Sequence, residues 1–221
     1  MTHRDSDRAR SYFDALAPEY NRAFQLTGKN PFSAAVNRFF RGPTFARRMR
    51  MLEGLLARLE VKGKRVLDLG CGSGQVSLLA ASMGATVTGI DIAPRMLAIA
   101  RESAQRAGLE ARLRYEEGDI SVCPLSEADL VFLVGVVEYY RDFGPVVSRA
   151  AAAAKRYLVI AHTNRVLYRM ILRRILFKFS GASVYFHPMK DVIAAATREG
   201  LKVVSEQRDP AFTLITFERI G

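Results

Sequence analysis

The residues that point most clearly to a chemical role form a glycine-rich turn that follows a short apolar run. Val66 to Leu69 is apolar except for Asp68, and the turn Gly70-Cys71-Gly72-Ser73-Gly74 follows it directly. Glycine lacks a Cβ, so such a turn can adopt positive φ and bring its backbone close to a ligand. A second apolar run ends in an acid at Asp91. A glycine turn and an acid at the ends of two strands indicate a site for a nucleoside-containing cofactor.

The spacing of the glycines narrows the choice of ligand. Dinucleotide-binding turns read G-x-G-x-x-G, in which the last glycine lets the helix N-terminus meet a pyrophosphate. This turn reads G-x-G-x-G, and Asp68 stands two residues before its first glycine. A carboxylate at that place would repel a pyrophosphate and attract a cation. S-adenosylmethionine fits this chemistry, because it carries a sulfonium and an ammonium group and has no phosphate.

Four landmarks in order resemble the class I S-adenosylmethionine-dependent methyltransferases of the small-molecule type. They are VLDLGCGSG, the acid that ends VTGIDI, GDI at 118–120, and ADLVFLVGVVEYYRD. The resemblance covers roughly residues 61 to 160 and implies S-adenosylmethionine as the cofactor. A fainter likeness, in the N-terminal helix and around Glu138, is to the magnesium-protoporphyrin O-methyltransferases, although those enzymes carry a histidine roughly where Glu138 stands.

The resemblance also implies which residues bind the cofactor. Asp91 is expected to accept hydrogen bonds from the ribose hydroxyls, Asp119 from the adenine amino group, and Tyr20 to meet the amino-acid end, with Tyr12 as the second candidate. Core packing is an equal interpretation of Ile92 and Met96, and a plain loop aspartate is the alternative for Asp119. The complete expected set is Tyr20, Asp68, Gly70, Cys71, Gly72, Gly74, Asp91, Ile92, Met96, Asp119, Ile120, Val134 and Gly135.

Methyl transfer from a sulfonium asks mainly for in-line positioning of the acceptor, and a base is needed only for a weakly acidic one. The candidates for catalysis are His162, Glu138 and Tyr139. His162 follows the predicted fifth strand at the edge where doubly wound proteins bind ligands. Each of these side chains has a structural alternative: a buried histidine, a backbone cap and an aromatic packed on the sheet edge.

The periodicity of apolar residues predicts the elements that must position this site. Helical stretches such as 75–83 and 94–107 separate the apolar runs, which is the signature of a doubly wound α/β fold with a mostly parallel sheet. The last two runs alternate apolar and polar residues and are expected to form an antiparallel C-terminal pair. The seven predicted strands are 65–69, 86–91, 112–116, 129–134, 157–161, 201–206 and 211–218.

The chain divides into a helical N-terminal lid, residues 1–60, and a methyltransferase core, residues 61–221, within one structural domain. Helices are predicted over 7–22 and 31–60 in the lid and over 189–199 in the core. An amphipathic helix is predicted as an insertion at about 163–180, with a basic stripe at Arg165, Arg169, Arg173, Arg174 and Lys178.

Three uses of the inserted helix stay open. Arg169 and Arg173, together with His187, are candidates for binding an anionic substrate. The same stripe suits an anionic membrane surface, and it also suits a solvated face of a helix packed on the core.

Charge and composition agree with a soluble α/β domain and restrict its partners. The chain has 221 residues, is 49% hydrophobic and carries a net charge of +11. The charge is +8 over residues 1–65, −2 over 66–160 and +5 over 161–221, which favours an anionic substrate or an acidic surface. Two cysteines make no disulfide framework or metal cluster, so no metal is expected. The absence of a signal peptide or membrane span favours the cytoplasm, with a membrane-peripheral position as the alternative.

The sequence therefore predicts methyl transfer to a small apolar or anionic acceptor, most simply at oxygen. Two other functions are weighed against it. A nucleic-acid methyltransferase suits the positive charge, but Gly135 to Glu138 replaces the Asn/Asp-Pro-Pro-aromatic loop and Cys123 precedes Pro124, so no catalytic Pro-Cys pair exists. A binding protein that keeps the cofactor and has lost turnover is the third possibility. The sequence does not determine the oligomeric state.

Overall fold

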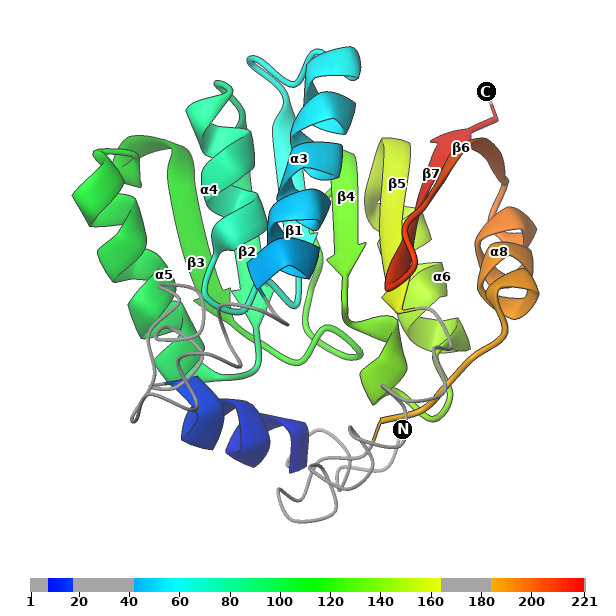
Figure 1. The fold of residues 1–221 in the computed structure, drawn as a ribbon, viewed down its shortest axis with the longest axis horizontal. Coiled ribbons are helices and arrows are strands. Elements are labelled where there is room, and N and C mark those ends of the chain that lie inside the picture. The colour runs from blue at the N-terminus through cyan, green and yellow to red at the C-terminus, as the bar shows by residue number, and fades with distance from the viewer. Residues whose placement is uncertain (1–7, 18–41, 164–183, 221) are drawn as a thin grey trace.

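The computed structural model describes residues 8–17, 42–163 and 184–220, and a seven-stranded sheet runs through the centre of them (Figure 1). The strand order is β3-β2-β1-β4-β5-β7-β6. The first five of these are parallel, and β7 is antiparallel to both β5 and β6. The strands are β1 Arg65–Leu69, β2 Thr86–Asp91, β3 Leu113–Glu117, β4 Ala128–Val134, β5 Ala154–Thr163, β6 Leu201–Arg208 and β7 Phe212–Arg219. The predicted doubly wound fold is confirmed.

Helices cover both faces of the sheet, because alternate residues of the buried strands point to opposite sides. On one face, Val66 of β1 packs with α3 (Gly42–Arg58) and α4 (Gln75–Ser82). On the other face, Leu67 and Leu69 pack with α6 (Gly144–Ala153) and α8 (Met189–Arg198). Helix α5 (Pro94–Ala107) packs beside α4 on the first face. The alternation turns Asp68 toward the α3 and α4 face.

Most predicted boundaries lie within two residues of the observed ones, and β5 is the exception. It was predicted at 157–161 and runs over Ala154–Thr163, because the chain enters the sheet directly from α6 and Ala154 pairs with Ala128 of β4. His162 therefore belongs to β5, paired with Thr213 of β7, and does not follow the strand as predicted. Short 3₁₀ turns at Glu110–Arg112 and Val137–Tyr139 were not predicted.

Residues 8–17 form a helix that lies across the ends of the parallel strands, below the sheet in Figure 1. This is the described part of the helix predicted over 7–22, and α3 is the described part of the one predicted over 31–60. Leu52, Leu55 and Leu56 of α3 are buried against the sheet. The predicted lid boundary at residue 60 stays a prediction. Tyr20, Arg169, Arg173 and residues 164–180 of the stretch predicted as an inserted helix lie outside the described residues, and Thr163 is the last residue of β5.

Within the described ranges, no helix combines the length and the apolar character that crossing a membrane would require.

Candidate functional site

The glycine turn joins β1 to α4 at the carboxyl edge of the sheet. Gly70, Gly72 and Gly74 have φ values of 72°, 54° and 78°, a conformation that strains any side-chain-bearing residue. A Cβ on Gly70 would overlap Val136, and one on Gly74 would overlap the hydroxyl of Tyr115. A Cβ on Gly72 would meet nothing within 4 Å. Gly72 is therefore the point at which the backbone is bare toward a ligand, whereas the other two glycines make room for the protein's own side chains.

Asp91 ends β2 and ties the glycine turn to the start of α5. Its Oδ2 accepts a hydrogen bond of 2.7 Å from the Gly72 N–H, and its Oδ1 accepts one of 2.9 Å from the Ala93 N–H. Burial raises the pKa of this carboxyl, while the two N–H donors oppose that rise. Each carboxylate oxygen can accept more than one hydrogen bond, so Asp91 keeps capacity for the two hydroxyls of a ribose.

Asp68 is buried beneath the turn. The Ser77 hydroxyl on α4 donates a hydrogen bond of 2.6 Å to its Oδ2. Burial raises the pKa of Asp68 from its usual 3.8 to about 6, an effect that the Ser77 hydrogen bond reduces and the nearby charge of Asp91 increases. Two acids thus lie close together in a region of low polarity, which favours a positively charged ligand.

Three of the expected adenine neighbours are Met96 in the first turn of α5 and Asp119 and Ile120 after β3, and their side chains are already engaged. Met96 is buried against Ala17 and Ala93. Oδ1 of Asp119 accepts hydrogen bonds from both the N–H and the hydroxyl of Ser121. Ile120 is buried in the core cluster on the α6 side. Core packing and turn capping therefore account for these three residues, and a contact with adenine stays a prediction.

The surroundings of Cys71 favour the neutral thiol over the thiolate. Burial raises the pKa of its thiol well above the usual range, and the charges of Asp68 and Asp91 add to that effect. It packs with Tyr115 of β3 and the residues of α5.

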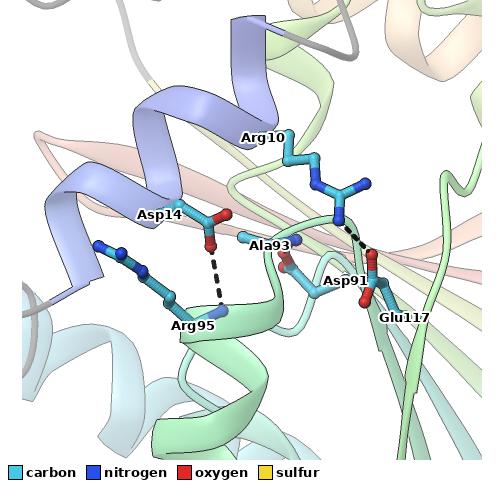
Figure 2. Close-up of polar contacts among 6 residues, drawn as sticks. All are labelled: Arg10, Asp14, Asp91, Ala93, Arg95 and Glu117. Atoms are coloured by element: carbon cyan, nitrogen blue, oxygen red, sulfur yellow. Dashed lines mark hydrogen bonds and ion pairs between the residues drawn. The ribbon is translucent and has the colours of Figure 1, made fainter.

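Helix 8–17 contacts both ends of the candidate site. Asp14 accepts a hydrogen bond of 3.0 Å from the Arg95 N–H, and Arg10 forms an ion pair of 2.6 Å with Glu117 (Figure 2). The Phe13 ring meets Tyr139 edge-on, with 5.0 Å between the ring centroids. Tyr12, the second candidate for the amino-acid end, packs against Phe13.

A pair of opposite charges lies where β4 ends. Gly135 has a φ of 71°, and a Cβ placed on it would lie 3.7 Å from Nη1 of Arg48 and 3.9 Å from Oε1 of Glu138. Thr163 of β5 donates a hydrogen bond of 2.7 Å to Oε1 of Glu138. Among the described residues, Nε of Arg48 and Oε2 of Glu138 are buried without a hydrogen-bond partner. Such buried polar atoms are costly and call for a ligand or an ordered water.

The two candidate histidines meet, and both bind backbone. Nε2 of His162 lies 2.9 Å from the carbonyl oxygen of His187, and Nε2 of His187 lies 2.8 Å from that of Tyr140. A carbonyl only accepts, so both Nε2 atoms carry the proton and a neutral His162 leaves Nδ1 as an acceptor. Nδ1 is buried without a partner among the described residues. The histidines hold the segment 184–188 against the loop after β4, and a role as base stays a prediction.

The structure brings most of the predicted residues to one edge of the sheet and adds others that the sequence did not reveal. The missed side chains are those that reach the site from distant elements. Ser77 had a local signal, a hydroxyl in the first turn of the helix after the glycines, whereas the others had none. The added residues are Arg10, Asp14, Arg48, Ser77 and Thr163. In the described ranges no three His, Cys, Asp or Glu side chains gather as a metal site would require.

Comparison with known proteins identifies the family of the segment that carries the candidate site. A family model described as a methyltransferase domain matches residues 66–159, the stretch from the glycine turn to β5. Residues 66–159 are a methyltransferase domain. The predicted family is thereby confirmed, and the domain contains Asp68, Asp91 and Glu138.

The relatives of this methyltransferase domain differ in what their names describe. A ubiquinone biosynthesis O-methyltransferase from Xanthomonas axonopodis pv. citri (strain 306) is 31% identical over 138 residues, which are 60% of this chain and 58% of that protein. A ribosomal protein L11 methyltransferase from Deinococcus radiodurans is 45% identical over 74 residues, 33% of this chain and 27% of that protein. The chain thus matches only part of the length of these relatives.

A solved structure similar over nearly the whole chain is a magnesium protoporphyrin IX methyltransferase from Synechocystis PCC 6803 with bound SAH. Its TM-score is 0.77 at 20% identity, and the match covers 96% of this chain and 98% of that one. At this identity the likeness is one of fold, and it confirms the Rossmann-like arrangement around the methyltransferase domain.

Proposed function

We propose that the chain binds S-adenosylmethionine at the glycine turn and transfers its methyl group to an oxygen atom of a small acceptor. The observation that carries this proposal is the tie between Asp91 and Gly72, which sets a carboxylate at the end of β2 beside the open glycine. When bound, S-adenosylmethionine supplies a methyl group activated by a sulfonium. The protein's task is then to bind, to orient and to exclude water.

Two acids suit the cofactor's chemistry. Asp91 would hold the ribose, since its Oδ2 lies 2.7 Å from the Gly72 nitrogen and both of its oxygens retain lone pairs. Asp68 would place a second carboxylate charge behind Gly70 and Gly72, which favours the cationic cofactor over a pyrophosphate.

Arg48 and Glu138 suit the amino-acid end of the cofactor. They bring opposite charges to one place beside Gly135, and each has a buried polar atom without a partner among the described residues. An α-amino acid group carries a carboxylate and an ammonium on one carbon, so it complements both side chains at once. Thr163 would orient the Glu138 carboxylate by its hydrogen bond to Oε1.

The acceptor would enter at the carboxyl ends of β4 and β5, beside the loop that carries Tyr139. The Tyr139 and Phe13 rings form an apolar border there, and the basic segments that flank the core favour an anionic group on the acceptor. Oxygen as the target is supported by the names of the relatives, which include O-methyltransferases that the chain matches over 138 residues. We also propose a location in the cytoplasm or at a membrane surface, and the net charge of +11 supports contact with an anionic membrane.

The test is transfer of a labelled methyl group from S-adenosylmethionine to a panel of acceptors. The panel contains catechols, porphyrins with free carboxyl groups, aromatic amines and RNA. Labelling of a catechol hydroxyl or a porphyrin carboxyl group by the wild type, with no labelling by Asp91→Ala, supports the proposal. Labelling of RNA or of amines alone would contradict the acceptor class, and the same panel therefore tests the alternative of a nucleic-acid substrate.

A further inference from the structure

Helix α5 begins without a cap of its own. The first turn of any helix leaves N–H groups without a partner inside the helix, and Asp, Asn, Ser or Thr at the N-cap position usually satisfies one of them. The N-cap residue here is Ala93, which has no side chain that could do so, and Pro94 follows it. The Arg95 N–H is instead satisfied by Asp14, which lies 81 residues earlier in the sequence, in helix 8–17.

Three side chains on one face of helix 8–17 seat it on this part of the molecule. Arg10, Asp14 and Ala17 are spaced by four and three residues, so they share a helical face. Arg10 pairs with Glu117 at the end of β3, and Asp14 reaches the first turn of α5 (Figure 2). Ala17 is 1% exposed and packs with Ala93 and Met96, where a larger side chain would force the two helices apart.

The same stretch of α5 belongs to the ribose site. Asp91 accepts from the Ala93 N–H and Asp14 from the Arg95 N–H, so one aspartate at the end of β2 and one from helix 8–17 hold N–H groups at the same helix start. The charge of Asp14 also contributes, after burial, to the raised pKa of Asp91. The position of helix 8–17 therefore affects both the geometry and the charge of the loop 91–95, to which the proposed function assigns the ribose.

We propose that Asp14 is a positioning residue for cofactor binding. Asp14 supplies the missing N-cap of α5, and the docking of helix 8–17 is thereby coupled to the order of the loop 91–95. This inference rests on the proposed function, because it assigns the ribose to that loop. The coupling is reciprocal: a cofactor that orders the loop strengthens the docking of the helix by the same factor. Phe13 on the same helix meets Tyr139, which extends the connection to the acceptor side.

The test compares three variants by calorimetric titration with S-adenosylhomocysteine. Asp14→Ala removes the cap and should weaken binding by up to about fivefold, which is the full stability cost of a typical lost N-cap expressed as a change in affinity. Asp14→Asn keeps an oxygen that can accept from the Arg95 N–H, and should bind within about twofold of the wild type. This rescue separates the hydrogen bond from the mere presence of a side chain.

Asp142→Ala is the matched control. Oδ1 of Asp142 accepts a hydrogen bond of 3.3 Å from the Gly144 N–H at the start of α6, so this variant also removes an acid from a helix start, on the other face of the sheet. Its melting temperature should fall about as much as that of Asp14→Ala, with unchanged affinity for S-adenosylhomocysteine. Unchanged affinity in Asp14→Ala, or an equal loss in Asp142→Ala, would overturn the proposal.

Hydrogen exchange without ligand separates this inference from the proposed function. The Arg95 amide should exchange faster in Asp14→Ala than in the wild type, and slowly again in Asp14→Asn. Failure of the wild type to bind S-adenosylhomocysteine would refute the proposed function and, with it, the positioning role, whereas the exchange data would still decide whether Asp14 caps α5. Equal exchange of the Arg95 amide in all three proteins would refute the claim that Asp14 caps α5.

Discussion

Arg48 offers a test that uses two ligands as well as two proteins. Replacing Arg48 by methionine removes the guanidinium beside Gly135 and keeps an apolar stem over the Phe212 ring, on which the guanidinium lies at 5.2 Å. A charge-assisted hydrogen bond contributes roughly 1.5 to 3 kcal/mol, which corresponds to about a 10- to 100-fold change in affinity. The Arg48→Met variant should lose this amount of affinity for S-adenosylhomocysteine.

The second ligand is 5′-methylthioadenosine, which has the adenosine and lacks the amino-acid end. Titration calorimetry should give nearly the same dissociation constant for it in the wild type and in Arg48→Met, because Arg48 has nothing to hold. Arg47→Met is the control, because Arg47 neighbours Arg48 on α3 but its guanidinium pairs at 2.7 Å with Asp209, between β6 and β7. An equal loss for both ligands would indicate general disruption of the fold, and no loss for either would refute the assignment of Arg48 to the amino-acid end.

Three further predictions follow from the same geometry. Glu138→Gln should weaken S-adenosylhomocysteine about tenfold or more and leave 5′-methylthioadenosine unchanged, because the buried carboxylate would lose its charge toward the ammonium group. Gly72→Ala should weaken S-adenosylhomocysteine binding and lower the free energy of unfolding by the ~1 to 2 kcal/mol that a positive φ costs, whereas Gly74→Ala should lower stability more, because a Cβ there would also overlap Tyr115 and Ala100. Asp68→Asn should raise the free energy of unfolding at pH 7 to 8 by up to about 3 kcal/mol and lower cofactor affinity, since the pKa of Asp68 is raised from 3.8 to about 6 in the folded protein.

The sign of the Asp68 effect follows from proton linkage. The folded protein binds this proton more tightly than the unfolded chain, so stability from this group is highest below about pH 4, falls as the pH rises toward 6, and is level above it. Urea unfolding of wild type and Asp68→Asn at pH 4 to 8 measures the difference, which should grow with pH. A constant difference across that range would contradict the linkage.

The glycine and Glu138 predictions have their own refuting outcomes. An equal loss of stability in Gly72→Ala and Gly74→Ala would contradict the distinction between the two glycines. Unchanged binding of both ligands by Glu138→Gln would refute the assignment of Glu138 to the amino-acid end of the cofactor.

The sequence predicts what depends on neighbours along the chain. The strands β1 and β2 and the helix α5 were predicted at their observed bounds, because alternating and helical apolar patterns are local. The early start of β5 was missed, since the alanines of α6 continue into the strand without a break and the pairing of Ala154 with Ala128 decides where it begins.

Contacts between distant elements explain what the sequence could not predict at the site. The reason for glycine at position 74 lies in Tyr115, the charge beside Gly135 comes from α3, and the cap of α5 comes from Asp14. No periodicity or motif encodes such pairings. Conversely, the places of Asp68 in β1 and of Asp91 at the end of β2 were predicted correctly, because an apolar strand pattern and a glycine turn fix where these residues lie along the chain.

The measurement that tests the central claim most directly is calorimetric titration of the full chain with S-adenosylhomocysteine, NAD and ATP, in the wild type and in Asp91→Ala. We expect micromolar binding of S-adenosylhomocysteine alone, weakened in Asp91→Ala by about 10- to 100-fold through loss of the ribose hydrogen bonds. Binding of NAD or ATP in its place, or an unchanged dissociation constant in Asp91→Ala, would contradict the assignment of this site to S-adenosylmethionine.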